Sequence, residues 1–162
     1  MALTSTQLTQ LKAVALADPT AAAFLIAGND TELAAWFNAP TIPDFWAYRK
    51  SIPVGEIGTT VNYKAIAAMT TANLDRVNNF LNMNKDRFTG RDDIKTFLND
   101  TFSGTLDGEG QNTRNALDVM LRRLANRFER TFATGTGTTL APGAPVEEGT
   151  IDTNTAAQIR TA

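Results

Sequence analysis

NTRNALDVMLRRLANRFERTFA, residues 112–133, carries the clearest helical pattern in the chain. Its large apolar side chains recur at the i, i+3 and i+4 spacing, which places them on one side of an α-helix. They are Leu117, Met120, Leu121, Leu124, Phe128 and Phe132. We therefore predict one continuous amphipathic helix over this range.

Upstream of this stretch, helix signals alternate with helix breakers. Thr4 or Ser5 can cap a first helix, and Asp18 followed by Pro19 is a typical start for a second, which Gly28 ends. Prolines and glycines interrupt residues 39–60, and three further segments with helical periodicity follow before residue 112. The pattern predicts an all-α fold, an irregular helical bundle of about five to seven helices with an extended C-terminal arm.

The composition changes near Thr134, after which Gly, Thr and Pro dominate. We therefore predict a helical body over residues 1–133 and an extended arm over residues 134–162. Disorder is the ordinary state of such a segment, but apolar residues are spaced along this one, which suits docking on a neighbouring subunit. The predicted docking residues are Leu140, Pro142, Val146, Ile151 and Ile159.

Arginines are concentrated in residues 112–133, which hold five of them against one Asp and one Glu, and no Lys. On one continuous helix, several of these side chains would lie opposite the apolar stripe. Such a face is either simply solvated or contacts an acidic partner or nucleic acid, and Arg suits bidentate pairing at interfaces. The residues predicted to contact a partner or DNA are Arg122, Arg123, Arg127 and Arg130.

The composition argues against catalysis. The 162 residues carry a formal charge of −2 and include neither Cys nor His, which excludes disulfides, Cys/His zinc sites, Cys nucleophiles and His bases. The acidic pairs Asp92–Asp93 and Glu147–Glu148 belong to no metal-binding motif. We predict no enzyme and no catalytic, cofactor-binding or metal-binding residue. The most apolar run, residues 21–27, is too short to span a membrane, so no membrane partner is expected.

Several short segments resemble small proteins encoded by tailed bacteriophages and prophages. They are Leu3–Lys12, Ala17–Pro19, Asn38–Pro40, Phe45–Arg49 and Arg122–Gly137. A helical body followed by an extended arm is, within that class, most similar to head–tail adaptor (connector) proteins. The resemblance implies a virion structural protein, made in the host cytoplasm and located at the head–tail junction. It further implies a homo-oligomeric, dodecameric ring that contacts the portal protein, a tail or neck protein and the packaged DNA.

Three other functions remain open from the sequence. The chain could be another phage neck, tail-completion or capsid-associated protein of similar size. A small nucleic-acid-binding regulator would use the Arg-rich last helix, although the acidic sequence pI of about 5.1 argues against it. A carboxylate-based hydrolase would need a Glu in an apolar setting, and Glu32, Glu56 and Glu109 have no such context in sequence.

Overall fold

The computed structural model describes residues 2–83, 86–102 and 108–162. The chain forms two compact units. Unit 1 is built from two separate segments, Met1–Ala47 and Leu124–Ala162, and unit 2 is the continuous segment Tyr48–Arg123 between them. The predicted boundary at residue 133 is therefore not where the structure divides, because residues 134–162 belong to unit 1 together with the N-terminal helices.

The chain is mostly helical, as the sequence predicts, but the described residues hold ten helices rather than five to seven. The helices of unit 1 are α1 (Ser5–Ala17), α2 (Pro19–Ala27), α3 (Asp30–Asn38), α9 (Arg127–Thr131) and α10 (Thr153–Thr161). Those of unit 2 are α4 (Gly55–Thr60), α5 (Tyr63–Ala67), α6 (Thr71–Met83), α7 (Asp92–Thr101) and α8 (Gly108–Met120). Several of these helices are only one or two turns long, and hydrophobic periodicity in the sequence does not separate such short helices from their neighbours.

Short strands form three two-stranded sheets in the described part of the chain. They are β1 (Trp46–Tyr48) with β4 (Arg122–Leu124), β2 (Ile52–Pro53) with β3 (Arg87–Phe88), and β5 (Ala133–Thr134) with β6 (Ala144–Pro145). The β2–β3 pair is antiparallel with Ile52 opposite Phe88, and the β5–β6 pair is antiparallel with Ala133 opposite Pro145. These strands fix loops rather than build a layer, so the architecture stays helical.

The predicted starts of the first two helices are confirmed. Thr4 caps α1 through a capping box with Gln7, in which each side chain accepts from the other residue's backbone. The Asp18 side chain accepts from the backbone N–H groups of Thr20 and Ala21 at the start of α2. Gly28, at φ +69°, ends α2 in the left-handed conformation that glycine adopts without a steric penalty.

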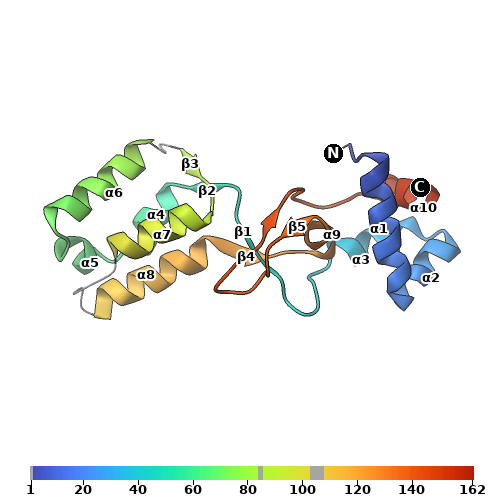
Figure 1. Ribbon diagram of the computed structural model, residues 1–162, viewed down its shortest axis with the longest axis horizontal. Coiled ribbons are helices and arrows are strands. Elements are labelled where there is room, and N and C mark those ends of the chain that lie inside the picture. The colour runs from blue at the N-terminus through green and yellow to red at the C-terminus, as the bar shows by residue number, and fades with distance from the viewer. Residues whose placement is uncertain (1, 84–85, 103–107) are drawn as a thin grey trace. The chain divides into compact units, whose positions relative to one another are not determined.

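The core of unit 1 joins helices from both ends of the sequence. α10 packs against α3 and α1, and α9 packs against the same two helices (Figure 1). Phe37 from α3 and Phe128 from α9 are completely buried in this core. Ile151 and Ile159 are buried in it as well, and the Asn38 amide binds both the N–H and the C=O of Ile151.

The burial of Ile151 and Ile159 corrects the prediction that residues 134–162 form an extended docking arm. Pro142 is also buried. Two of the five predicted docking residues, Leu140 and Val146, do expose their side chains, by 81% and 62%. The composition of this segment resembles a free tail, but its apolar residues fill a core supplied by distant helices.

The predicted single helix over residues 112–133 is likewise wrong. α8 ends at Met120, Arg122–Leu124 form a strand, and α9 begins only at Arg127. The backbone N–H of Ala125 donates to the Phe45 C=O and that of Arg127 to the Ala39 C=O, so neither supports a helix with the preceding turn. Asn126 then starts α9 through a capping box with Glu129.

Unit 2 has its own core of helices α4 to α8 and the β2–β3 pair. Phe80 of α6 stacks on Phe97 of α7 and meets Phe88 of β3 edge-on, with ring centroids 4.9 and 5.3 Å away. Gly90 lies where its N–H reaches the Arg49 C=O at 2.6 Å, and a Cβ there would collide with the Leu121 C=O. Three segments of unit 2 thus meet at a residue that has room for no side chain.

None of the described helices is by itself long and apolar enough to cross a membrane. α1 and α2 meet the length and composition for a span only when taken together, and they are bent by 116° at their junction.

Candidate protein-contact site

The structure separates the four arginines that the sequence predicts on one helix face. Arg122 and Arg123 lie in β4 and belong to unit 2, whereas Arg127 and Arg130 lie in α9 of unit 1. Arg122 Nη1 donates to Asp118 Oδ2 at 3.2 Å, and Lys95 lies 3.5 Å from the other oxygen of Asp118. Arg122 is therefore part of a charge cluster inside unit 2, and the predicted continuous basic face does not form.

Arg127 and Arg130 line a cavity of about 330 Å³ in unit 1, which we call the arginine cavity. Its walls come from α1, α3, α9 and the segment that follows α3. The other lining residues are Val14, Ala17, Asp18, Trp36, Thr41, Ile42 and Thr131. Both guanidinium groups and a set of apolar side chains thus surround one space.

The two arginines are held in place by backbone carbonyls and aromatic rings. Arg127 Nη1 donates to the Trp36 C=O at 2.8 Å, and its Cζ lies 4.8 Å from the centroid of the Trp36 ring. Arg130 Nη1 makes a long 3.5 Å contact with the Pro43 C=O, and its Cζ lies 5.8 Å from the Phe45 ring centroid. Cation–π contact orients a guanidinium without neutralising it. Among the described residues, no carboxylate forms an ion pair with either arginine.

Thr41 places a buried hydroxyl beside the arginine cavity. The residue is 2% exposed, and its Oγ1 finds no hydrogen-bond partner in the described part of the chain. Its backbone N–H donates to the Ala125 C=O at 3.3 Å, which fixes the residue. A buried hydroxyl without a partner costs about 1–3 kcal/mol. Such a group is uncommon in folded proteins and is a reason to look for a ligand.

Asp18 contributes the one carboxylate that lines the arginine cavity. Its Oδ1 already accepts the N–H groups of Thr20 and Ala21 as the cap of α2, at 2.9 and 3.1 Å. This carboxylate serves as a helix cap, and the lining holds two arginines against this one acidic residue. The lining of the cavity therefore carries a net positive charge.

A hairpin loop of unit 1 contacts the Phe45 ring, which Arg130 also contacts. The hairpin loop, residues 135–143 between β5 and β6, is fastened to Trp46, whose N–H donates to the Gly137 C=O and whose C=O accepts from the Gly143 N–H. The Phe45 ring lies against Gly137 and Gly143, where any Cβ would collide with it. Leu140 on this fastened loop remains 81% exposed. The loop thus presents a large apolar side chain from a fixed support.

Residue type identified Arg127, Arg130 and Leu140 in advance, but sequence analysis missed Trp36, Thr41 and Ile42 as their neighbours. Of the two aromatic residues beside these arginines, Trp36 lines the cavity and Phe45 is buried. One local signal was available: Asn126 and Glu129 have the spacing of a capping box, which marks a helix start. That spacing indicates that Arg127 and Arg130 belong to a helix of their own.

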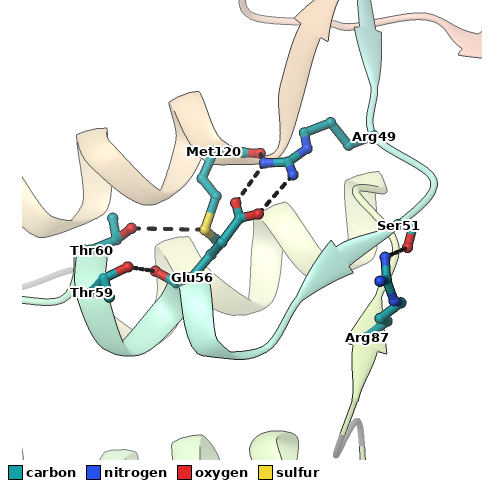
Figure 2. A network of polar contacts seen from close by, with 7 residues as sticks. All are labelled: Arg49, Ser51, Glu56, Thr59, Thr60, Arg87 and Met120. Carbon is teal, nitrogen blue, oxygen red and sulfur yellow. Dashed lines mark hydrogen bonds and ion pairs between the residues drawn. The ribbon is translucent and has the colours of Figure 1, made fainter.

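Unit 2 has a polar network in which arginines pair with carboxylates or hydroxyls (Figure 2). Arg49 binds Glu56 through two hydrogen bonds of 2.7 and 2.9 Å and also donates to the Met120 C=O. The Arg49 guanidinium lowers the pKa of Glu56 below its ordinary value, although desolvation offsets part of that effect. Arg87 donates to Ser51 at 2.8 Å. These arginines hold segments of unit 2 together.

A buried tyrosine belongs to the same unit. The Tyr48 hydroxyl donates to Asp92, and desolvation together with this hydrogen bond raises the pKa of Tyr48 above its ordinary value. Among the described residues, no group of three or more His, Cys, Asp or Glu side chains is placed to hold a metal ion. No protein-family model, curated protein or solved structure matches the chain.

Proposed function

We propose that this chain is a structural, non-catalytic subunit of a tailed-bacteriophage particle, of the head–tail adaptor type. In this proposal it forms a homo-oligomeric ring at the head–tail junction, between the portal protein and a tail or neck protein. The observation that carries the proposal is the exposure of Leu140 on the fastened hairpin loop. Single exposed apolar side chains are common on protein surfaces, so the support lies in combining Leu140 with a second exposed apolar residue, Val146, directly after β6.

The location of the residues behind the phage resemblance supports the same proposal. Leu3–Lys12, Ala17–Pro19 and Asn38–Pro40 belong to unit 1, as does Leu124–Gly137 from the last segment. Unit 1 also carries the hairpin loop and the arginine cavity. The resemblance and the candidate contact surface thus lie mainly in unit 1, although Tyr48 and Arg49 of the segment Phe45–Arg49 and Arg122 and Arg123 belong to unit 2.

The structure changes how such a subunit would reach its neighbour in a ring. Because Ile151 and Ile159 are committed to the core of unit 1, they are not available to a second copy. The proposed contact to the adjacent copy is the hairpin loop with Leu140, together with Val146, which follows β6. A loop that is already ordered loses little conformational entropy on binding, and a closed ring repeats one contact many times.

The test measures the mass of the assembly formed by the full chain, alone and with the portal protein of the same phage, by native mass spectrometry. Truncation at residue 133 is unsuitable, because it would remove α10 from the core. We expect the double variant L140D/V146D to reduce ring formation by about tenfold or more. The matched control is I26D, which alters an equally exposed apolar side chain of α2, 84% exposed. A chain that stays monomeric with and without the portal would overturn the proposal.

The arrangement of the arginines does not favour the nucleic-acid-binding alternative. It depended on one arginine-rich helix, and the structure instead distributes those arginines between β4 and α9 in different units. The hydrolase alternative gains no support from Glu56, whose carboxylate pairs with Arg49 in unit 2.

A further inference from the structure

We propose that the arginine cavity is a binding site for a carboxylate attached to an apolar group, supplied by a polypeptide partner. The carboxylate is either an acidic side chain beside an apolar residue or the end of a chain. This inference goes beyond the proposed function, because it concerns what the cavity recognises in whatever assembly the chain belongs to. It is independent of Leu140 and of ring formation.

The lining of the arginine cavity carries a net positive charge. Two guanidinium groups line it, and no described carboxylate pairs with them. The one carboxylate in the lining, that of Asp18, is committed to the cap of α2. An incoming anion would therefore meet two arginines against one carboxylate in the lining, and neither arginine is ion-paired among the described residues.

The contacts that orient the two arginines use few of their N–H donors. Arg127 commits one Nη1 hydrogen bond to the Trp36 C=O, and Arg130 makes a single long contact to the Pro43 C=O. A guanidinium has five N–H donors, so most donors of both groups remain for a ligand. The planar fork of Arg matches the two oxygens of a carboxylate, and side chains already fixed by aromatic rings lose little entropy on binding.

The Thr41 hydroxyl is a third group that an anion could bind. It is the one buried side-chain polar atom among the described lining residues that has no partner. A hydroxyl can donate to a carboxylate oxygen, and this bond would satisfy it. An anion at the cavity would thus give the buried hydroxyl a hydrogen-bond partner and place a counter-charge beside Arg127 and Arg130.

Size and lining favour a carboxylate with an apolar neighbour over a nucleic-acid phosphate. The space of about 330 Å³ is at the small end of ligand sites and suits one or two side chains. Val14, Trp36 and Ile42 supply apolar surface beside the arginines. Binding to a nucleic-acid backbone needs a broad positive surface, whereas this chain has a formal charge of −2.

The test titrates the full chain with small probes and follows the indole N–H of Trp36 and the Nε–H of Arg130 by NMR. N-acetylphenylalanine presents a terminal carboxylate, N-acetyl-Glu-Phe-amide presents a side-chain carboxylate, and N-acetylphenylalaninamide is the neutral control. We expect at least one acid to bind with a dissociation constant on the order of 1 mM and the amide to bind at least tenfold more weakly. The tighter acid identifies the source of the carboxylate.

Two variants and a matched control make the proposal falsifiable. R130Q should weaken binding of the acid about tenfold, while R76Q, the same change on the exposed face of α6, should leave it unchanged. T41V should act in opposite directions, raising the unfolding temperature of the free chain but weakening binding about threefold to tenfold. Equal affinity for acid and amide would overturn the proposal, as would an unchanged affinity in both R130Q and T41V. Binding of a short DNA duplex at these residues more tightly than either acid would overturn it in favour of phosphate recognition.

Discussion

Two arginines in each unit of this chain are held in opposite ways, although unit 1 also contains a paired arginine, Arg160 with Asp30. In unit 2, Arg49 meets Glu56 through two short hydrogen bonds, and Arg122 meets Asp118. In unit 1, Arg127 and Arg130 rest on carbonyl oxygens and aromatic rings instead. The charge of a paired arginine is neutralised by a carboxylate of the same chain and stabilises the fold. An arginine that is oriented without a counter-charge can instead bind an anion from outside the chain. Residue type alone does not separate these two uses.

The aromatic residues allow this comparison to be tested unit by unit. Both tryptophans, Trp36 and Trp46, belong to unit 1, and both tyrosines, Tyr48 and Tyr63, belong to unit 2. Tryptophan fluorescence therefore reports unfolding of unit 1. The tyrosine absorbance change on unfolding of unit 2 comes from Tyr48, which is buried, since Tyr63 is 89% exposed in the folded chain.

The largest effect on stability is expected at Gly90, which lies against the backbone of Arg49. Gly90→Ala would drive a Cβ into the Leu121 C=O and crowd the backbone of Arg49, with a predicted loss of about 2–3 kcal/mol. Urea unfolding followed by tyrosine absorbance measures this loss. Gly58→Ala is the control, because nothing lies within 4 Å of its added methyl and Ala favours the helix. Equal stability of the two variants would refute this account of Gly90.

A direct test of the paired arginine is Arg49→Met. The change keeps much of the apolar stem but removes the hydrogen bonds to Glu56 and to the Met120 C=O. The two side chains are 27% and 36% exposed, so solvent screens part of their attraction. We expect unit 2 to lose about 1–2 kcal/mol in urea unfolding by the tyrosine signal. An unchanged midpoint would mean that the network in Figure 2 does not stabilise unit 2.

The same pair predicts a modest acid sensitivity of unit 2. Arg49 lowers the pKa of Glu56 in the folded chain below its ordinary value of 4.5. A carboxyl whose folded pKa is lowered contributes stability above its unfolded pKa and loses that contribution as the pH falls through the folded value. Glu56→Gln should therefore reduce the loss of unit 2 stability between neutral pH and about pH 3.

The control for this pH profile lies in unit 1. Arg160 lowers the pKa of Asp30 through its own hydrogen bonds, so unit 1 has a separate acid dependence. Glu56→Gln should leave the tryptophan-detected profile unchanged. A parallel change in both profiles would contradict the assignment of this effect to the Arg49–Glu56 pair.

The smallest effect is expected for the arginine without a counter-charge. Arg130→Met removes only a long contact to the Pro43 C=O and a stacking contact with Phe45, and Arg130 is an exposed residue. We expect the stability of unit 1 to change by less than about 0.5 kcal/mol in tryptophan-detected unfolding. A loss as large as that of Arg49→Met would mean that both arginines serve the fold.

Local chemistry in the sequence was sufficient to predict where α1 and α2 start and where α2 ends. Asp18 before Pro19 and the glycine at position 28 act on their immediate neighbours, so their effect is visible without the rest of the fold. The apolar stripe over residues 112–133 was less informative, because a helix, a strand and a second helix in succession bury most of the same residues, with Leu124 exposed. Its interruption depends on Phe45 and Ala39, which accept hydrogen bonds from Ala125 and Arg127.

The candidate site shows the same limit. Arginine-rich composition identified Arg127 and Arg130, but Trp36 lies 91 positions before Arg127, and Pro43 lies 87 positions before Arg130. Likewise, the Gly- and Pro-rich composition of residues 134–149 gives no indication that Ile151 binds Asn38, which lies 113 positions earlier. Such pairings are decided by the tertiary fold and leave no local pattern.

The division of unit 1 into two chain segments has a consequence for synthesis on the ribosome. α1, α2 and α3 emerge first, yet Leu11, Leu33 and Phe37 can be fully covered only after α9 and α10 have been made. Unit 2 is continuous and can close as soon as residue 123 has left the exit tunnel. The nascent chain thus carries an uncovered apolar surface at its leading end while its middle folds, and this is the interval in which a chaperone would be needed.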